Sequence, residues 1–303
     1  MHIVVVDTSR VVLKVVAGML EPRGHRVDVF TDSREALAHV TDTPSVDALI
    51  TSLETRPIAG FELCWSARLL AEERRPLYII AMSSLKNVRN LSEALDSGAD
   101  DFISKPPVAE ELQARLRAAQ RVTGMQRELI KLAETDSLSG LYNHGAFVRR
   151  LADAARRQGD HGRLSLVLMD MDHFKTINDG HGHDVGDATI RAVGALLAEY
   201  AAASGGFAGR MGGEEFAIGL PGKRGLEGAE VAKGLRERLS QLRVRGRTGP
   251  LRVSASYGVS EWSDGETVEG LLKRADIALY DAKSSGRDRV MSAFADLHVA
   301  RVG

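Results

Sequence analysis

Cysteine is nearly absent from the 303-residue sequence, in which Cys64 is the single thiol. One cysteine excludes an intrachain disulfide and a cysteine-based zinc site, and it is typical of a reducing cytosol. The sequence also lacks any apolar run close to the roughly 18 residues that span a bilayer. No basic stretch and no apolar signal core precede the strand-like Ile3-Val4-Val5-Val6. We therefore expect an intracellular, cytoplasmic protein without membrane insertion.

An excess of one charge is lacking as well. The chain has 40 Lys plus Arg and 41 Asp plus Glu, which gives a formal net charge of -1. This balance argues against nucleic acid as a partner, although it permits a local phosphate site. With 44% hydrophobic and 27% charged residues, the composition is that of a folded globular chain. At about 150 residues per domain, the length predicts two domains.

Short β-branched runs alternate with helical patterns through the first half of the chain. Five repeats of this alternation predict an α/β domain with a doubly wound, five-stranded parallel sheet, because parallel strands need crossover helices that cover both faces. We expect strands at 4–6, 27–30, 48–50, 77–82 and 101–104, and helices at 9–20, 33–40, 60–73 and 88–97. Ligands of such sheets bind beyond the carboxyl ends of the strands. The residues to inspect there are Asp7, Thr8, Ser52, Ser83 and Lys105.

Residues 108–134 contain no proline and keep a helical pattern throughout. Their apolar spacing is consistent with a helix that continues as a short coiled coil into the second half, although Gly124 and Gln126 interrupt the seam. A single amphipathic helix packed on the first domain fits the pattern equally well. We expect a first domain over residues 1–122, a helical linker over 123–134 and a second domain over 135–303.

The second half mixes its elements differently. We expect strands at 164–169, 251–260 and 289–291, and helices at 185–203, 225–242 and 268–284. Two further strands within 207–220 flank a Gly212-Gly213 turn. A hairpin inside a βα alternation predicts an α+β domain with a mixed sheet that is antiparallel at its centre.

Two aspartates close the buried strand Leu166-Val-Leu-Met-Asp170-Met-Asp172. We expect them to project to opposite faces, so that only one enters a given site. Asp170 is then the better metal candidate, with the Met171 carbonyl beside it. Oxygen ligands without His or Cys are typical of Mg²⁺, which is often shared with substrate phosphates. The alternative is that both aspartates cap the following helix.

The segment Arg210-Met-Gly212-Gly213-Glu214-Glu215-Phe216 places two glutamates directly after a tight turn that needs positive φ. A metal ion would relieve the repulsion between these crowded negative charges. Taken alone, the motif also fits an ordinary solvated hairpin.

The glycine-rich segment after the aspartates has features of a nucleotide site. Asn178 and Asp187 carry donors and acceptors for a base edge, and a carboxylate opposite guanine N1–H and N2–H₂ selects guanine over adenine. Backbone N–H groups around Phe174 and Lys175 can hold phosphate at a helix start. The alternative is a capped helix-turn-helix without a ligand.

A pair of cations, Lys283 and Arg287, lies four residues apart at the expected C-terminus of the last helix. There the two side chains complement the helix dipole, and they can equally reach phosphates. A pair of solvated surface cations is the alternative.

In combination these motifs resemble GGDEF-type diguanylate cyclases. The segments Asp136-Ser-Leu-Ser-Gly-Leu-Tyr-Asn143, 170–187, Gly212-Gly-Glu-Glu-Phe216 and 274–287 occur in the order of that family, and the resemblance covers residues 135–292. It implies condensation of two GTP into cyclic di-GMP with release of two pyrophosphates. Because the product is two-fold symmetric, two active sites must face each other, and a homodimer is expected to be required for catalysis.

The resemblance also implies a role for each candidate residue. Mg²⁺ or Mn²⁺ would be bound by Asp170, the Met171 carbonyl and Glu214. Glu214 is the expected proton acceptor, with Glu215 second, and Lys175 would neutralise charge on the transferred phosphoryl group. The remaining residues would bind GTP: Asn178, His183 and Asp187 at the guanosine, and Lys283 and Arg287 at the phosphates, where the backbone around Phe174 is also expected to bind.

One stretch departs from the family pattern. Members that are inhibited by their product carry Arg-x-x-Asp shortly before the glycine pair, and here the matching stretch is Ala203-Ser-Gly-Gly206, with neither charge. We therefore expect weak or absent product inhibition through that position. The alternative function is a catalytically silent module that binds GTP or cyclic di-GMP, and a cyclase with an adenine-containing product is disfavoured by Asp187.

Residues 1–122 resemble a response-regulator receiver domain. The strongest match is Gly98-Ala-Asp-Asp-Phe102-Ile-Ser-Lys105-Pro106. The resemblance implies a cis peptide bond before Pro106, a switch hydroxyl at Ser83 and a switch aromatic ring at Phe102.

The receiver motif is incomplete at its reactive position. Ser52 stands where the phosphorylatable aspartate belongs, and Thr8 replaces the second acid after the first strand, which leaves Asp7. Phosphotransfer needs a carboxylate nucleophile and Mg²⁺ held by several oxygens. We expect a degenerate receiver that holds the dimer or docks a protein partner. In the alternative, Glu54 or Asp7 takes over as the acceptor.

Overall fold

The computed structural model describes residues 1–72, 75–84, 88–158, 163–247 and 249–293. The chain divides into two compact units, residues 1–131 and 132–303, and the last ten residues of the expected second domain lie outside the described ranges. One helix, α5 (Ala109–Glu134), begins in the first unit and ends in the second. Within the described ranges, no helix is long and apolar enough to cross a membrane.

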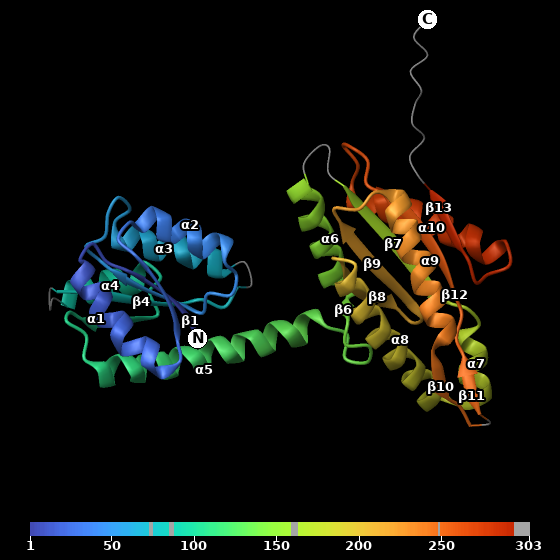
Figure 1. The fold of residues 1–303 in the computed structure, drawn as a ribbon, viewed down its shortest axis with the longest axis horizontal. Coiled ribbons are helices and arrows are strands. Elements are labelled where there is room, and N and C mark those ends of the chain that lie inside the picture. The colour runs from blue at the N-terminus through green and yellow to red at the C-terminus, as the bar shows by residue number, and fades with distance from the viewer. Residues whose placement is uncertain (73–74, 85–87, 159–162, 248, 294–303) are drawn as a thin grey trace, which may run out of the picture. The chain divides into compact units, whose positions relative to one another are not determined.

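A five-stranded sheet organises the first unit (Figure 1). Its order is β2-β1-β3-β4-β5, and every neighbouring pair is parallel, which confirms the doubly wound prediction. The strands are β1 (His2–Val6), β2 (Arg26–Phe30), β3 (Ala48–Ser52), β4 (Tyr78–Ser83) and β5 (Asp101–Ser104). The crossover helices are α1 (Arg10–Leu20), α2 (Ser33–Asp42), α3 (Gly60–Glu72) and α4 (Val88–Asp96), and a short 3₁₀ helix, η1 (Glu21–Arg23), follows α1.

The alternation of side chains along β1 builds two cores in this unit. Ile3 and Val5 pack with α1 and the first half of α5, whereas Val4 and Val6 pack with α2 and α3. Because all five strands run parallel, the residues at their carboxyl ends meet at one edge of the sheet. The Lys105–Pro106 peptide bond at this edge is cis, as the resemblance implied.

Only the first part of α5 is buried in the first unit. Leu112 and Leu116 are covered by the core, whereas Leu129 and Leu132 are 65% and 73% exposed. The coiled coil over the second part of the helix stays a prediction.

A six-stranded mixed sheet organises the second unit, in the order β13-β12-β7-β9-β8-β6. The pairs among β12, β7, β9 and β8 are antiparallel and the two outer pairs are parallel, which confirms the predicted mixed sheet. The strands are β6 (Tyr142–Asn143), β7 (Leu164–Met171), β8 (Phe207–Gly212), β9 (Glu215–Pro221), β12 (Ala255–Glu261) and β13 (Val290–Ala293). The helices are α6 (His144–Gln158), α7 (Phe174–His181), α8 (His183–Ala203), α9 (Gly225–Gln241) and α10 (Val268–Ser284).

Helices cover both faces of this sheet. Leu164 and Leu166 of β7 pack with α6 and α10, whereas Val167 and Met169 pack with α8 and α9. The carboxyl end of β7 therefore lies between α10 on one face and the α7–α8 pair on the other.

Two expectations about elements of this unit were incomplete. Helix α6 was not predicted, although Phe147, Leu151 and Ala154 have the spacing of a buried helix face. The expected strand 251–260 is divided instead into β11 (Pro250–Arg252), which pairs with β10 (Arg243–Arg245) in a separate hairpin, and β12. Ser254 lies between the two strands, and its hydroxyl donates a hydrogen bond to Asp172.

Candidate active site

Asp170 ends the buried central strand of the second unit beside the last turn of α10. Its Oδ2 lies 2.7 Å from Lys283 Nζ, and only 11% of the Asp170 side chain is exposed. Across the antiparallel pairing, Asp170 stands directly opposite Glu215 of β9. The fold therefore brings together one carboxylate, one predicted phosphate ligand and one of the hairpin glutamates.

The expected separation of Asp170 and Asp172 onto opposite faces is wrong, because residues two apart in a strand share a face. Asp172 accepts hydrogen bonds from the hydroxyls of Ser254 and Ser256, at 2.9 and 2.7 Å, and from the backbone N–H of Asp288 at 3.1 Å. Both carboxylates thus lie on the α10 side, and their partners distinguish them. Asp172 accepts from uncharged donors that fix the end of the strand, whereas Asp170 forms an ion pair with Lys283.

The two glutamates follow the turn and add negative charge at the same place. The Glu214 carbonyl accepts a hydrogen bond of 3.2 Å from the Met171 N–H. Burial, together with the nearby carboxylate of Asp170, raises the pKa of Glu215 above its ordinary value, and Lys283 opposes this effect. The crowding predicted from the sequence is therefore present.

The residue types at this strand end suit a hard divalent cation. Asp170, Glu214 and the Met171 carbonyl carry oxygen donors without His or Cys, which is the donor set of Mg²⁺ or Mn²⁺, and the Met171 N–H to Glu214 carbonyl hydrogen bond keeps the two backbones adjacent. Burial is the main cause of the raised Glu215 pKa, and a positive ion would relieve the added repulsion from Asp170. The residues present fit the expected cation.

Arg210 fixes the turn that carries these glutamates, a role that sequence reasoning missed. The turn residue Gly213 has φ of 48°, the left-handed region expected of its glycine pair. The Arg210 guanidinium donates to the Gly213 carbonyl at 2.7 and 3.0 Å and to Asp136 Oδ1 at 3.0 Å. Burial alone would raise the pKa of Asp136, but hydrogen bonds from Ser139 and Arg210 lower it.

Replacing Arg210 with Ala should lower both stability and turnover. Removing a largely buried cation that makes charged hydrogen bonds costs about 2 kcal/mol of unfolding free energy. The freed turn would also lose its fixed position. Chemical unfolding and the initial rate with GTP measure both effects. As the matched control, Arg238→Ala removes an exposed ion pair to Glu199 and should change unfolding by less than about 0.5 kcal/mol. Equal stability of the two variants would contradict the role of Arg210.

The predicted guanosine residues lie on α7 and α8. Asn178 lies against Gly186, because a Cβ added to Gly186 would be 1.9 Å from Asn178 Oδ1. Asp187 is half exposed one residue further along α8, and His183 is exposed at its start. These polar groups border the short break between the two helices at Gly182.

The remaining predicted ligands take different places. Phe174 is buried in the core, so its ring anchors the start of α7. Phe174 is also the first residue of the helix, and the backbone N–H groups of a first helical turn have no partner within the helix. Lys175 is exposed. Arg287 lies beyond the end of α10 rather than on it, and has φ of 62°. Only Lys283 of the expected cation pair is therefore held within the last helical turn.

In the incomplete receiver site of the first unit, the Glu54 carboxylate of the chain itself lies among the predicted site residues. Glu54 accepts hydrogen bonds from the hydroxyls of Ser52 and Ser83, at 2.7 and 2.8 Å, and from Lys105 Nζ at 2.8 Å. Lys105 also forms an ion pair of 2.7 Å with Asp7. Thr8 is exposed beside them. The hydroxyls and the amine that would surround an added phosphoryl group are thus already engaged by Glu54.

The environment of Glu54 makes the first unit sensitive to acid. Burial alone would raise the pKa of Glu54, but hydrogen bonds from Lys105, Ser52 and Ser83 outweigh it and lower the pKa to about 2. A carboxyl whose pKa is lower in the folded state stabilises that state above its unfolded pKa, and the contribution is lost as the pH falls toward the folded pKa.

Glu54→Gln should therefore weaken the acid dependence of stability between about pH 4.5 and pH 2. At neutral pH the variant should be less stable than the parent, because an amide N–H₂ cannot accept from Lys105. Urea unfolding as a function of pH measures both effects. Glu62→Gln, a change at an exposed glutamate of α3, is the control. A Glu54→Gln pH profile parallel to that of the parent would contradict this assignment.

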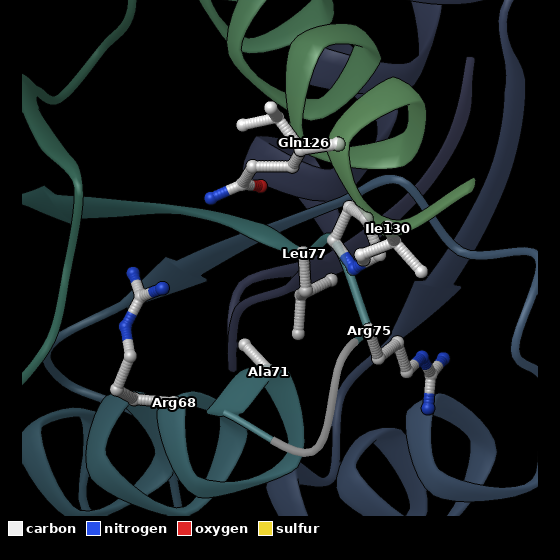
Figure 2. A pocket seen from close by; sticks show the side chains of 8 residues that line it. Arg68, Ala71, Arg75, Leu77, Gln126 and Ile130 are labelled. Carbon is white, nitrogen blue, oxygen red and sulfur yellow. The ribbon is translucent and has the colours of Figure 1, made fainter. Parts of the chain in front are cut away.

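A separate cavity of about 340 Å³ lies in the first unit between α3, the start of β4 and α5. Figure 2 shows Arg68, Ala71 and Leu77 on one side, and Gln126 and Ile130 of α5 on the other. It is lined by none of the residues predicted for the two sites above.

Comparisons with known proteins match both units. Residues 133–289 match the family described as "Diguanylate cyclase, GGDEF domain", and residues 3–117 match "Response regulator receiver domain". The Response regulator PleD of Caulobacter vibrioides is 33% identical over 88% of this chain, which spans 60% of that relative's length. Diguanylate cyclase VdcA of Vibrio cholerae is 32% identical over 85% of this chain and 72% of its own.

The solved structures that resemble the chain include the following two. The coiled coil and GGDEF domain of DgcB from Caulobacter crescentus, in complex with c-di-GMP, is 33% identical with a TM-score of 0.54, and covers 60% of this chain and 99% of that one. Diguanylate cyclase SiaD from Pseudomonas aeruginosa, in complex with its activator SiaC, is 36% identical with a TM-score of 0.52, and covers 61% of this chain and 72% of that one.

Proposed function

Because the chain belongs to the GGDEF diguanylate cyclase family and carries a receiver domain ahead of the GGDEF domain, we propose that it condenses two GTP into cyclic di-GMP and two pyrophosphates. The observation that carries the proposal is the meeting of Asp170, Glu215 and Lys283 at the end of β7, with the Glu214 backbone bonded to Met171. Acidic oxygens for a cation and a basic group for phosphate are thereby combined at one strand end.

In the proposed reaction the 3′-hydroxyl oxygen of one GTP forms a bond to the α-phosphorus of another, and the bond from that phosphorus to pyrophosphate breaks. The same exchange in the opposite direction closes the ring and releases the second pyrophosphate. Glu214 accepts the hydroxyl proton. Asp170, the Met171 carbonyl and Glu214 would hold Mg²⁺ or Mn²⁺, which supplies positive charge to the phosphate oxygens when bound. Lys175, Lys283 and Arg287 contribute further positive charge at the phosphates.

Guanine is proposed to bind at the break between α7 and α8. The Asp187 carboxylate accepts from the guanine N1–H and N2–H₂ groups, which adenine does not present in that arrangement. Asn178 and His183 complete the guanosine contacts, and Asn178 is positioned by its packing on Gly186.

Catalysis by this arrangement requires two copies of the chain. One GGDEF domain binds one GTP, and the two-fold product forms only when two sites face each other. We propose a homodimer in which the receiver-like unit maintains the dimer or docks a protein partner without an aspartyl-phosphate switch. The engagement of Ser52, Ser83 and Lys105 by Glu54 supports this proposal.

Incubation of the purified protein with GTP and Mg²⁺, with nucleotides resolved at several protein concentrations, tests the proposed function. Cyclic di-GMP should form with more than first-order dependence on protein. GTP binding without any product would instead favour the silent module.

A small-molecule phosphodonor tests the receiver-like unit separately. A covalent acyl phosphate together with a raised cyclase rate would overturn the proposal that the unit acts without phosphorylation.

Product inhibition through the position before the hairpin should be weak or absent. The stretch Ala203-Ser-Gly-Gly206 offers neither an arginine nor a carboxylate to a bound product dimer. Rates measured with added cyclic di-GMP should stay close to the uninhibited rate, apart from competition at the GTP site. Tight binding of cyclic di-GMP with an inhibited steady state that excess GTP does not relieve would contradict this prediction.

A further inference from the structure

Three side chains from three elements of the first unit meet at the amino end of its sheet. His2 lies on β1, Asp28 on β2 and His39 in the last turn of α2. Nε2 of His2 is 2.6 Å from Asp28 Oδ2, and Nε2 of His39 is 3.0 Å from the same oxygen. In the part of the chain that the structure describes, these are the one set of three or more His, Cys, Asp or Glu ligand atoms that lie within 4.8 Å of one another.

His2 is buried and held in one orientation. Its Nδ1 lies 3.2 Å from Ser45 Oγ, a hydroxyl that can accept the Nδ1–H. Because the Asp28 carboxylate can only accept, Nε2 carries a hydrogen in the contact of 2.6 Å, and release of that proton on metal binding would leave the Nε2 lone pair directed toward Asp28 and His39. Metal-binding histidines usually have such a partner on the second ring nitrogen, because it fixes the ring and the tautomer. The His2 backbone N–H also donates to Asp47 Oδ2 at 2.7 Å, which fixes the main chain.

We propose that His2, Asp28 and His39 bind a divalent transition metal of the zinc class. Two imidazoles and one carboxylate are the protein ligands of open tetrahedral zinc sites, whose fourth position is left for water or another ligand. Bonds of about 2.0–2.1 Å place tetrahedral ligand atoms roughly 3.3 Å apart. The two nitrogen–oxygen distances must lengthen by ~0.3 and ~0.7 Å, and the two histidine nitrogens, which lie within 4.8 Å of each other, must reach the same separation of roughly 3.3 Å.

The chemistry of the ligands separates this site from the proposed cyclase site. Imidazole nitrogens favour zinc, nickel, cobalt or copper, whereas Mg²⁺ prefers oxygens and retains water. His2 is the first residue of β1, and Asp7 follows its last, so the cluster and the incomplete receiver site lie at opposite ends of the same strand. Zinc binding by this cluster is therefore independent of the proposed reaction.

Calorimetric titration of the full-length, metal-free protein with Zn²⁺ in excess Mg²⁺ tests the proposal. The Asp170→Asn background removes the other candidate cation site. One equivalent of Zn²⁺ should bind, and His39→Ala should weaken the affinity by roughly tenfold or more. His39 is 29% exposed, so its removal should leave the fold intact, which circular dichroism checks.

His25→Ala is the matched control, because His25 lies near the Met1 amine, 3.5 Å from it, and outside the cluster. This variant should bind Zn²⁺ as the parent does. Replacement of Zn²⁺ by Co²⁺ should give the visible absorption of a tetrahedral site, and Asp28→Asn should weaken that absorption. Equal Zn²⁺ affinity in His39→Ala and His25→Ala, or no binding of micromolar Zn²⁺ by the parent, would overturn the proposal.

Discussion

Replacing Glu214 with glutamine is expected to reduce cyclic di-GMP formation by roughly 10²- to 10⁴-fold, the range associated with loss of a general base. Glutamine has nearly the same shape but carries no charge to accept a proton or to hold a cation. The Glu214 contact that the structure records is made by its backbone carbonyl to the Met171 N–H, and the substitution does not alter it. Initial rates with GTP measure the loss, and thermal unfolding should be unchanged.

The companion variant Glu215→Gln distinguishes the two glutamates. Burial and the neighbouring carboxylate of Asp170 raise the pKa of Glu215, which makes its carboxylate a stronger base than an ordinary glutamate. Glu214→Gln is nevertheless expected to reduce cyclic di-GMP formation more than Glu215→Gln does, because Glu214 is also one of the proposed cation ligands. A larger loss in Glu215→Gln would transfer the proton-accepting role to Glu215, and turnover by Glu214→Gln within tenfold of the parent would contradict the prediction.

Replacing Gly186 with alanine is expected to lower kcat/KM for GTP by roughly 10²-fold, chiefly through a higher KM. The added methyl group would lie 1.9 Å from Asn178 Oδ1, so the amide must leave its position. A displacement of about 1 Å in a positioning residue is sufficient for a loss of this size. Steady-state kinetics over a range of GTP concentrations measure it.

Gly180→Ala on α7 is the matched control, because a Cβ there meets nothing within 4 Å. It should keep the KM of the parent. A double-mutant cycle tests the route of the effect: in the Asn178→Ala background, Gly186→Ala should cost little more. An unchanged KM in the single Gly186→Ala variant would show that Asn178 does not position guanosine.

Local patterns in the sequence were sufficient for most of the fold. The β-branched runs such as Ile3–Val6 and the amphipathic spacing between them correctly predicted the parallel sheet, since burial on both faces leaves a clear signal. The Gly212-Gly213 turn likewise correctly predicted the hairpin β8–β9. Helix α6 had a comparable signal at Phe147 and Leu151, and its omission was an error of reading rather than a limit of the sequence.

The contacts of the candidate site were harder to predict because they join residues distant in sequence. Arg210 reaches Asp136 across 74 positions, and Ser256 reaches Asp172 across 84. No periodicity encodes such pairs. The same holds for Glu54, whose bonds to Ser83 and Lys105 depend on the meeting of three strand ends. Sequence reasoning located the strand ends that carry the candidate residues, and tertiary packing determined the partners of those residues.

The two contacts of Arg210, to Asp136 and to the Gly213 carbonyl, have a consequence for how a signal could reach the active site. Asp136 follows α5 by two residues, and the same guanidinium that binds it also binds the Gly213 carbonyl. We expect a rotation of the last turn of α5 either to move the glutamate-bearing turn through this contact or to break the ion pair. The rate of the proposed reaction is then expected to depend on the orientation of a helix that carries none of the proposed GTP ligands.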